Sequence, residues 1–325
     1  MAGRKAVVFA YHNVGVRCLK VLLAGGVDVA LVVTHDDNPD ENVWFDSVVS
    51  LCRAEGIAYV TPADARGADL LAAVSVAQPD FLFSFYYRHM LPAALLAVAP
   101  AFNMHGSLLP QFRGRAPVNW AVLRGATETG ATLHEMTVKP DAGAIVHQTA
   151  VPILPDDTAY EVFGKVQVAA EQTLWHVLPA LLDGSAPRRL NDLTSGAYFG
   201  GRTPADGRID WSQPAQAVYN LHRAVAPPYP GAFTELGGST YVIERARLSR
   251  RTAAGASLPA GLAVVDNGIF GVCGDGRLLQ IDQLSSAGQP VTPAQLMAAL
   301  NPALNCALNC ALNTAVNARG IQSPY

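Results

Sequence analysis

Residues 101–110 read Ala-Phe-Asn-Met-His-Gly-Ser-Leu-Leu-Pro, an apolar strand-like segment with two polar side chains before a Gly-Ser turn. Asn103 and His105 are two positions apart, so on a strand they face the same side. The chain before them alternates short apolar runs with segments of helical spacing, which is typical of a parallel sheet covered by helices on both faces. Both side chains stand at the carboxyl edge of that sheet, where ligands bind in open α/β folds.

The apolar runs and helical segments of the first half predict its elements in detail. We expect strands at residues 6–10, 27–34, 59–60, 81–85 and 101–105, and helices at 14–23, 44–55, 68–77 and 92–97. Two further strands, 132–136 and 145–153, precede a long closing helix at 158–182. The predicted fold class is α/β, with a Rossmann-like, mainly parallel sheet and helices on both faces.

The amino-acid composition changes between residues 183 and 206, where Gly, Ser, Pro, Arg and Asn dominate and the hydrophobic periodicity is lost. We place a linker there. A helix is expected at 215–224, followed by short strands at 232–235, 240–245, 261–266, 269–273 and 278–283. These strands predict a smaller β-rich C-terminal domain. The expected division is a first domain over 1–190, the β-rich domain over 205–290, and a tail over 291–325 with low-complexity Ala-Leu-Asn repeats.

Composition and charge disfavour several classes of function. The 325 residues carry a net charge of -3. A protein that binds nucleic acid through its phosphates normally has an excess of basic residues, so we expect no nucleic-acid partner. No apolar run is long enough for a membrane span and no secretory signal is present, so the expectation is cytoplasmic residence without a membrane partner. The five cysteines are odd in number and scattered, which fits free thiols in a reducing compartment.

Motifs for metal or dinucleotide binding are incomplete. His134-Glu135 begins like a zinc-protease helix, but Val138 stands where the second histidine is required. Cys306 and Cys310 lie one helical turn apart without the further ligands of a zinc site. The first strand-to-helix turn lacks the glycines of the dinucleotide fingerprint. We therefore expect no metal and no nicotinamide cofactor.

Asp141 begins a second informative segment, Asp-Ala-Gly-Ala-Ile, in a loop that could bring its carboxylate to the imidazole of His105. A carboxamide N–H such as that of Asn103 stabilises an oxyanion, and an imidazole moves protons near neutral pH. A carboxylate orients the imidazole and raises its pKa. Acyl transfer to an amine requires these groups, so Asn103, His105 and Asp141 are the candidate catalytic residues.

Each of these residues also has a structural interpretation on its own. His105 could be a satisfied buried histidine, and Asp141 a turn residue before Gly143. Tyr86 and Tyr87 follow a buried strand, where plain packing is an alternative to a binding role. The combination of types and spacings favours the functional interpretation of the catalytic candidates.

The segments Asn-x-His-x-Ser-Leu-Leu-Pro and Asp-x-Gly-x-Ile resemble the signature of the 10-formyltetrahydrofolate-dependent formyltransferases. Within that family the likeness is greatest to the formyltransferase half of a bifunctional enzyme of lipid A modification. Four further segments carry it: Phe9-Ala10-Tyr11-His12, Thr34-His35-Asp36-Asp37-Asn38-Pro39, Phe83-Ser84-Phe85-Tyr86-Tyr87-Arg88-His89 and Phe199-Gly200-Gly201-Arg202-Thr203-Pro204. The likeness runs from the first strand to about Gln283.

The resemblance implies that Asn103, His105 and Asp141 hold the catalytic places and that 10-formyltetrahydrofolate is the co-substrate. The folate contacts that it implies are Tyr86, Tyr87, Arg88, Arg115, Thr137, Val138, Lys139, Pro140 and Asp141. The implied acceptor is the 4-amino group of a UDP-linked amino sugar, UDP-4-amino-4-deoxy-L-arabinose, in lipid A modification and polymyxin resistance. Arg202 and Thr203 would lie beside this nucleotide-sugar.

The chain departs from that relative in two respects. The relative carries a dehydrogenase half that is lacking here, so we expect formyl transfer alone and leave the oligomeric state open. Gly201 stands where the relative has an arginine, so we do not carry over the possible contact of that arginine with an anion. Two alternatives remain: a methionyl-tRNA formyltransferase, which needs a basic surface, and a non-catalytic folate- or nucleotide-binding module, which needs no proton-shuttling set.

Overall fold

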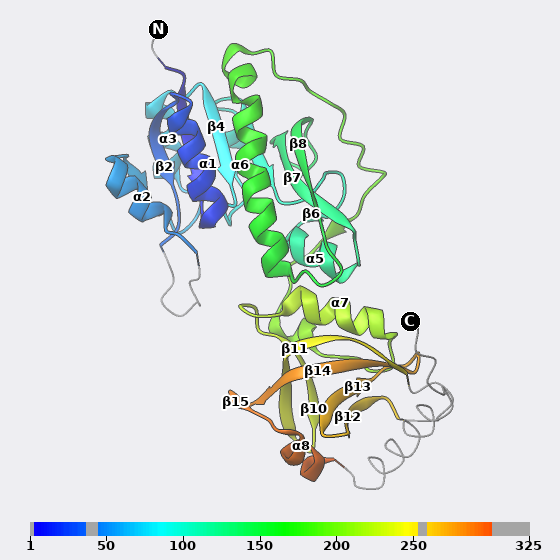
Figure 1. The fold of residues 1–325 in the computed structure, drawn as a ribbon. Coiled ribbons are helices and arrows are strands. Elements are labelled where there is room, and N and C mark those ends of the chain that lie inside the picture. The colour runs from blue at the N-terminus through cyan, green and yellow to red at the C-terminus, as the bar shows by residue number, and fades with distance from the viewer. Residues whose placement is uncertain (1–2, 37–44, 253–258, 301–325) are drawn as a thin grey trace. The chain divides into compact units, whose positions relative to one another are not determined.

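The computed structural model describes residues 3–36, 45–252 and 259–300 (Figure 1). They form two compact units. The first unit comprises the chain up to Ala121 together with Thr127–Ile153 and Glu161–Gly201. The second comprises Val122–Ala126, Leu154–Tyr160 and the chain from Arg202 onward. Because two short segments of the first half belong to the second unit, the units interleave in sequence, and the division into 1–190, 205–290 and 291–325 stays a prediction.

A seven-stranded sheet forms the centre of the first unit, in the order β3-β2-β1-β4-β5-β7-β8. Its strands are β1 (Lys5–Ala10), β2 (Asp28–Val33), β3 (Tyr59–Val60), β4 (Phe81–Phe85), β5 (Ala101–His105), β7 (Glu128–Glu135) and β8 (Ile145–Pro152). The neighbouring strands β3, β2, β1, β4 and β5 run parallel to one another. By contrast, β7 is antiparallel to both β5 and β8. The predicted mainly parallel sheet is confirmed, and the reversal at β7 is an addition to it.

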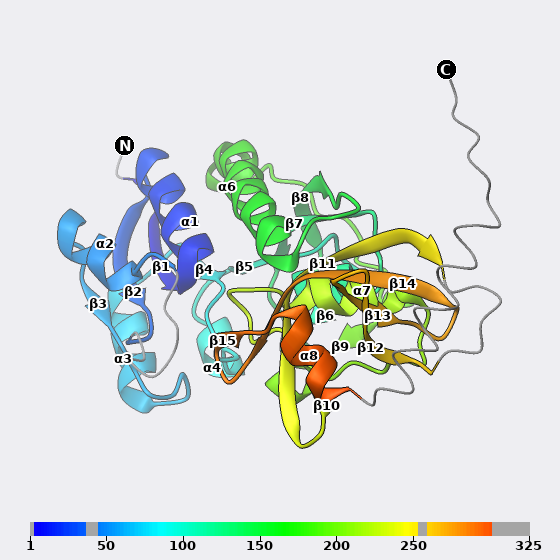
Figure 2. The same cartoon turned by 60° about the horizontal axis from the view of Figure 1, so that its bottom comes forward.

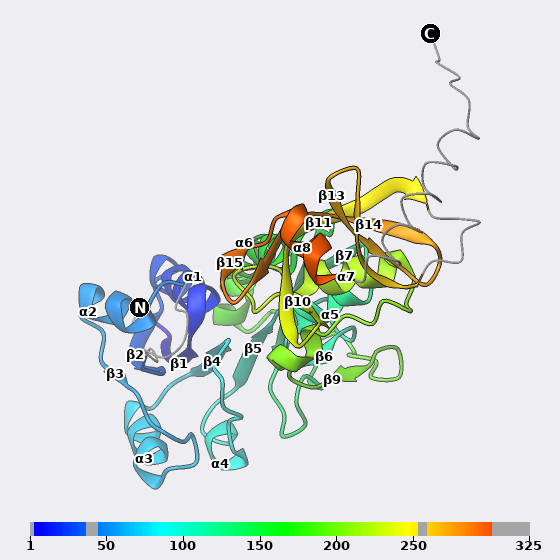
Figure 3. The same ribbon diagram turned by 90° about the horizontal axis from the view of Figure 1, so that it is seen from below.

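Helices cover both faces of this sheet. Figures 2 and 3 show α1 (His12–Ala24) and α6 (Ala159–Asp183) on one face and α3 (Ala68–Ala77) and α4 (Ala93–Leu96) on the other. The helix α2 (Val48–Glu55) contacts α1. A buried apolar cluster includes Val7, Phe9, Leu31, Val33, Leu70, Val74, Leu82 and Leu95. Strands buried on both faces read as continuous apolar runs, which is why the sequence predicted them.

Three short elements near β5 were not predicted: β6 (Arg113–Gly114), α5 (Pro117–Leu123) and β9 (Tyr198–Phe199). The strands β6 and β9 pair with each other in parallel. The guanidinium of Arg113 donates to the carbonyls of Leu193 and Gly196 at 3.1 and 2.7 Å. The segment 183–206, expected as a linker, therefore belongs to the first unit as far as Gly201, because strand pairing and a buried arginine hold its aperiodic backbone.

The second unit is built on an antiparallel sheet in the order β10-β11-β14-β13-β12, with β15 paired to β14. Its strands are β10 (Ala232–Leu236), β11 (Ser239–Thr252), β12 (Gly261–Val265), β13 (Gly268–Val272), β14 (Arg277–Ser286) and β15 (Gln289–Pro290). A 3-10 turn, η1 (Pro204–Gly207), precedes the helix α7 (Ala215–Val225), which contacts β10, β11 and β14. The predicted smaller β-rich domain is confirmed, although β11 is much longer than the expected strand 240–245.

A helix, α8 (Pro293–Ala299), occupies part of the stretch 291–325 that was expected as a tail. Thr292 begins it, because its hydroxyl accepts a hydrogen bond from the N–H of Gln295 at 3.3 Å. The repeats from residue 301 on, with Cys306 and Cys310, lie outside the described residues, as do Asp37, Asn38 and Pro39.

Across residues 3–36, 45–252 and 259–300, no helix combines the length and the apolar character needed to cross a membrane.

Candidate active site

Asn103 and His105 lie on β5, and their spacing of two turns both side chains to one face of the sheet. Only 6% of the His105 side chain is exposed, whereas Asn103 is half-buried. β5 pairs with β4 on one side and with β7 on the other. The His105 imidazole is therefore enclosed, whereas residue Asn103 as a whole is only partly buried.

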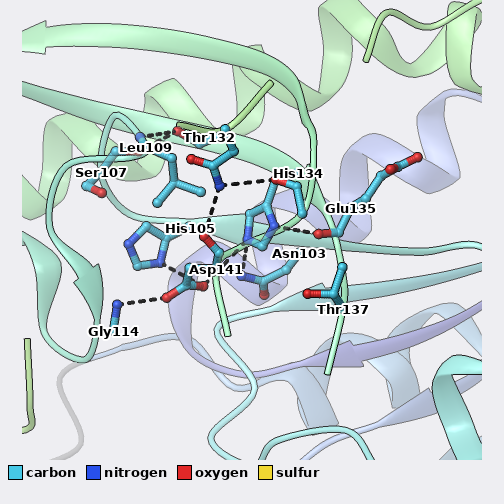
Figure 4. Close-up of polar contacts among 12 residues, drawn as sticks. Asn103, His105, Ser107, Leu109, Gly114, Thr132, His134, Glu135, Thr137 and Asp141 are labelled. Atoms are coloured by element: carbon cyan, nitrogen blue, oxygen red, sulfur yellow. Dashed lines mark hydrogen bonds and ion pairs between the residues drawn. The ribbon is translucent and has the colours of Figure 1, made fainter. Parts of the chain in front are cut away.

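The antiparallel register between β5 and β7 brings a second histidine into the site. Asn103 pairs with His134, and His105 pairs with Thr132. Thr132 pairs in turn with Gln148 on β8. Directly opposite residues of neighbouring strands project to the same face. Polar side chains from three adjacent strands therefore share one patch of the sheet, and Figure 4 shows those of β5 and β7.

Asp141 comes from the loop between β7 and β8 and lies near both imidazoles (Figure 4). Its Oδ1 atom is 3.6 Å from Nδ1 of His105 and 3.6 Å from Nε2 of His134. Its Oδ2 atom accepts a hydrogen bond from the N–H of Gly114 at 2.7 Å. Its backbone has a φ of 51°, and Asn191 Nδ2 donates to its carbonyl at 2.9 Å. The three predicted catalytic side chains thus come together.

Gly143 lets the loop that carries Asp141 return close to β7. A Cβ atom at this position would lie 2.0 Å from the backbone oxygen of Glu135, a separation that no side chain tolerates. The carbonyl of Gly143 also accepts a hydrogen bond from Asn191 Nδ2 at 3.1 Å. The position of the Asp141 carboxylate therefore depends on the close approach of Gly143 to the backbone of Glu135 and on the buried side-chain amide of Asn191.

Buried hydroxyl groups shape the loop after β5. The hydroxyl of Thr132 donates to the carbonyl of Ser107 at 2.6 Å, and the hydroxyl of Ser107 donates to the carbonyl of Gln111 at 2.6 Å. The loop places the carbonyl oxygen of Phe112 2.9 Å from Nε2 of His105. Both ring nitrogens of His105 therefore face oxygen atoms from the protein.

The carbonyl of Phe112 determines which nitrogen of His105 carries hydrogen. The Phe112 oxygen and the Asp141 carboxylate both only accept, but Phe112 lies within hydrogen-bond distance of Nε2 at 2.9 Å, whereas the carboxylate is 3.6 Å from Nδ1. We therefore assign the hydrogen of the neutral ring to Nε2 and the lone pair to Nδ1. The Nδ1 atom faces the carboxylate of Asp141. It can accept a proton, and the adjacent negative charge stabilises the imidazolium that results.

Burial and charge oppose each other in the His105–Asp141 pair. Burial alone raises the pKa of the Asp141 carboxyl, but His105, His134 and the N–H of Gly114 together lower it to about 2. Burial lowers the pKa of His105, and the Asp141 carboxylate and the Phe112 carbonyl offset this only in part. The expected effect of Asp141 on the pKa of His105 is present, but burial outweighs it, so a carboxylate faces a neutral imidazole at neutral pH.

In the described part of the chain, no cluster of three or more His, Cys, Asp or Glu side chains is arranged to hold a metal ion. The described cysteines, Cys18, Cys52 and Cys273, are free thiols.

Two family models match the chain. The formyl transferase model matches residues 6–178, which is more than half of the chain, and the model of the formyl transferase C-terminal domain matches residues 202–301. The chain belongs to the formyl transferase family. The resemblance seen in residues 101–110 and 141–145 is confirmed at the level of this enzyme family.

Solved structures share the fold of this formyl transferase. The N-formyltransferase from Helicobacter canadensis, in complex with folinic acid and dTDP-3-aminofucose, gives a TM-score of 0.68 at 18% identity and covers 86% of this chain and 98% of that chain. WlaRD, a sugar 3N-formyl transferase in the presence of dTDP and 5-N-formyl-THF, gives 0.66 at 17% identity, covering 88% and 98%. A sugar N-formyltransferase from a Shewanella species gives 0.61 at 20% identity, covering 75% and 98%.

Tyr86, one of the predicted folate contacts of the formyl transferase, follows β4 and packs against the turn after His105. It has a φ of 59°. A Cβ atom at Gly106 would lie 2.0 Å from its hydroxyl oxygen, so a larger residue there would require the tyrosine ring to move. Tyr86 thus borders the candidate catalytic residues.

Tyr87 and Arg88, also predicted folate contacts, pack against residues that follow β1 and β2, and their contact with folate stays a prediction. The ring of Tyr87 stacks on that of His35 with centroids 4.3 Å apart. The guanidinium carbon of Arg88 lies 4.6 Å from the ring centroid of Tyr11. The N–H of Arg88 donates to Nε2 of His35 at 3.2 Å. These contacts hold the backbone of the segment after β4 in place.

Arg115 and residues 137–140, the remaining predicted folate contacts, adjoin Asp141. Arg115 is exposed and follows Gly114, whose N–H binds the Asp141 carboxylate. Thr137, Val138, Lys139 and Pro140 form the largely exposed loop that leads to Asp141. The hydroxyl of Thr137 donates to the carbonyl of Lys139 at 2.8 Å, which tightens this loop.

Arg202 and Thr203, the predicted sugar contacts, belong to the second unit. The guanidinium of Arg202 donates to the carbonyl of Asp206 at 3.0 Å, and the N–H of Thr203 donates to the Asp206 carboxylate at 2.5 Å. These bonds hold the 3-10 turn η1. A contact of either residue with a nucleotide-sugar stays a prediction.

His134 is the residue of this site that sequence analysis missed, because it was considered only as part of an incomplete zinc motif. Thr132 and His134 alternate with the buried Ala131 and Leu133 on β7, which marks one polar face of the strand. That alternation was the available signal. The register of β7 against β5 was needed to place this face beside Asn103.

Proposed function

We propose that this formyl transferase moves a formyl group from 10-formyltetrahydrofolate to the amino group of a nucleotide-linked sugar. The observation that carries the proposal is the meeting of Asn103, His105 and Asp141 on one polar patch of the sheet. Membership of the formyl transferase family supports the reaction. The amino-sugar substrates named with structures of the same fold support the class of acceptor.

His105 moves the proton in the proposed reaction. The amine nitrogen forms a bond to the formyl carbon and gives its proton to Nδ1 of His105, the atom that keeps a lone pair. Asp141 stabilises the imidazolium by its charge. His105 then returns the proton to the departing folate nitrogen as the carbon–nitrogen bond to folate breaks, so the products are the N-formyl sugar and tetrahydrofolate.

Asn103 stabilises the negative charge that develops on the formyl oxygen. Its carboxamide nitrogen carries two hydrogens, and its half-buried position keeps it accessible to a ligand. One donor of this kind is worth about 10²–10³ in rate. For the folate itself we propose contacts with the backbone of residues 86–88, with Arg115, and with residues 137–141.

For the acceptor we propose UDP-4-amino-4-deoxy-L-arabinose, in lipid A modification and polymyxin resistance. Motifs spread along the chain support this choice, notably Phe-Ser-Phe-Tyr-Tyr-Arg-His at 83–89 and Phe-Gly-Gly-Arg-Thr-Pro at 199–204. The relatives with solved structures are named with dTDP or a dTDP-linked sugar, so the nucleotide is a variable of the experiment. Arg202 and Thr203 are the proposed contacts for it.

Parallel reactions with different acceptors test the proposal. The purified full chain is mixed with 10-formyltetrahydrofolate and, separately, with UDP-4-amino-4-deoxy-L-arabinose, a dTDP-linked 3-amino sugar, or methionyl-tRNA. Mass spectrometry then detects replacement of one hydrogen by a formyl group. We expect formylation of a nucleotide-sugar by the wild type and little or none by the Asn103→Ala variant.

Two results would contradict the proposal in different ways. Formylation of methionyl-tRNA alone would identify a tRNA-modifying enzyme. Binding of 10-formyltetrahydrofolate without turnover of any amine would identify a binding module. The net charge of -3 disfavours the first, and the proton-shuttling set disfavours the second.

A further inference from the structure

His134 contacts the candidate oxyanion donor directly. Its Nε2 atom lies 3.1 Å from Nδ2 of Asn103, and its Nδ1 atom lies 2.7 Å from the backbone oxygen of Glu135 (Figure 4). Only 2% of its side chain is exposed. The pairing of Asn103 with His134 across β5 and β7 makes this contact a property of the sheet register.

The partners of His134 determine its tautomer. The carbonyl oxygen of Glu135 only accepts, so Nδ1 carries a hydrogen. The amide nitrogen of Asn103 only donates, so Nε2 presents its lone pair. One chain of bonds therefore runs from the Asn103 carboxamide through the ring to the backbone of β7.

Asp141 is a weaker neighbour of the same nitrogen. Its Oδ1 atom lies 3.6 Å from Nε2 of His134, which is beyond hydrogen-bond distance. The carboxylate therefore acts on His134 by its charge, whereas the Asn103 amide occupies the lone pair. The same Oδ1 atom lies 3.6 Å from Nδ1 of His105, so the carboxylate acts on both rings by its charge.

We propose that His134 is a positioning residue for formyl transfer: its Nε2 lone pair holds one N–H of the Asn103 carboxamide and leaves the other N–H for the formyl oxygen. The inference rests on the proposed function, which assigns Asn103 to that oxygen. A carboxamide turned by half a rotation has nearly the same shape but presents oxygen, which repels the developing charge. His134 selects the orientation that donates.

Two substitutions separate this role from a purely structural one. His134→Gln places its carboxamide near the Nε2 position, so its oxygen can accept from Asn103 while the bond to Glu135 is lost. His134→Asn places its carboxamide near the Nδ1 position, so the bond to Glu135 survives while the contact with Asn103 is lost. Each variant therefore keeps one of the two hydrogen bonds of His134.

We expect His134→Asn to lower kcat about tenfold, because the Asn103 N–H is no longer directed at the formyl oxygen. KM for both substrates should be nearly unchanged. His134→Gln should retain more activity than His134→Asn. A structural role through the Glu135 bond predicts the opposite order. That order, or equal losses that follow the melting temperature, would overturn the inference.

A double-mutant cycle with Asn103→Ala provides an independent measurement. If His134 acts through Asn103, adding His134→Asn to Asn103→Ala lowers kcat little further. Multiplicative losses would show that His134 acts by another route and would overturn the inference.

Nitrogen NMR of the histidine rings separates this inference from the proposed function. The spectrum of the ligand-free wild type, recorded at a pH where the histidine rings are neutral, should show His134 with hydrogen on Nδ1 only, and His134→Asn identifies its signals. Hydrogen on Nε2 would overturn the inference, whatever the enzyme formylates. Failure of the wild type to formylate any amine would overturn the proposed function and leave the observed tautomer standing.

Discussion

Oδ1 of Asp141 lies 3.6 Å from Nδ1 of His105, although one residue stands in the loop after β7 and the other ends β5. The carboxylate is held from the other side by the N–H of Gly114. Both side chains are largely buried, at 11% and 6% exposure. A charged carboxylate next to an enclosed neutral imidazole is an arrangement that favours proton transfer onto the ring.

Asp141→Asn should remain folded and lose about 10²–10⁴ in kcat, because the amide oxygen can still accept from Gly114 while the charge that stabilises the His105 imidazolium is lost. The measurement is formyl transfer to the accepted amine, with the melting temperature recorded alongside. Asp69→Asn removes the same charge from an exposed position in α3 and should turn over like the wild type. Equal rates for Asp141→Asn and the wild type would exclude a role of Asp141 in proton transfer.

The acid limb of the kcat profile should have its midpoint below 6.5, the ordinary pKa of histidine, because burial lowers the pKa of His105. Neutral His105 is the form that accepts the proton, so activity falls as the pH drops through this pKa. Asp141→Asn should move the midpoint further down, since the Asp141 carboxylate raises the pKa of His105. An upward shift would contradict the assignment of His105 as the base.

The free energy of unfolding should depend on pH through Asp141. Its pKa is lowered from 3.8 to about 2 in the folded chain, so its contribution is complete above 3.8 and is lost as the pH falls toward 2. The difference amounts to about 2 kcal/mol. Denaturant unfolding of the wild type and of Asp141→Asn across this pH range measures the difference. If the unfolding free energies of the two proteins differ by a constant amount at every pH, folding does not lower the pKa of the Asp141 carboxyl.

Gly143→Ala should lower both stability and turnover, because a Cβ atom would meet the backbone oxygen of Glu135 at 2.0 Å and push the Asp141 loop away from β7. The cost is about 1–3 kcal/mol. The matched control is Gly164→Ala in α6, where no atom beyond the adjacent residues and the backbone of the helix itself lies within 4 Å of the new Cβ. This control should gain about 0.5–1 kcal/mol with unchanged turnover, as measured by thermal unfolding and formyl transfer.

The buried parallel strands were predictable because a strand covered on both faces must be apolar throughout. The predicted strands 81–85 and 101–105 coincide with β4 and β5, and 6–10 differs from β1 by one residue. The direction of a neighbouring strand leaves no such trace, since side-chain alternation is the same for parallel and antiparallel pairs. The reversal of β7 and the pairing of β6 with β9 therefore came only from the structure.

The sequence by itself determined that Asn103 and His105 share a face, because two covalent steps along a strand return a side chain to the same side. It also marked Asp141 as a partner through the family signature. Only the tertiary structure decided that His134 joins them, that Asn191 and Gly143 hold the Asp141 loop, and that Phe112 occupies Nε2 of His105. These contacts depend on strand register and loop closure between segments far apart in the chain, and local residue patterns do not encode such distances.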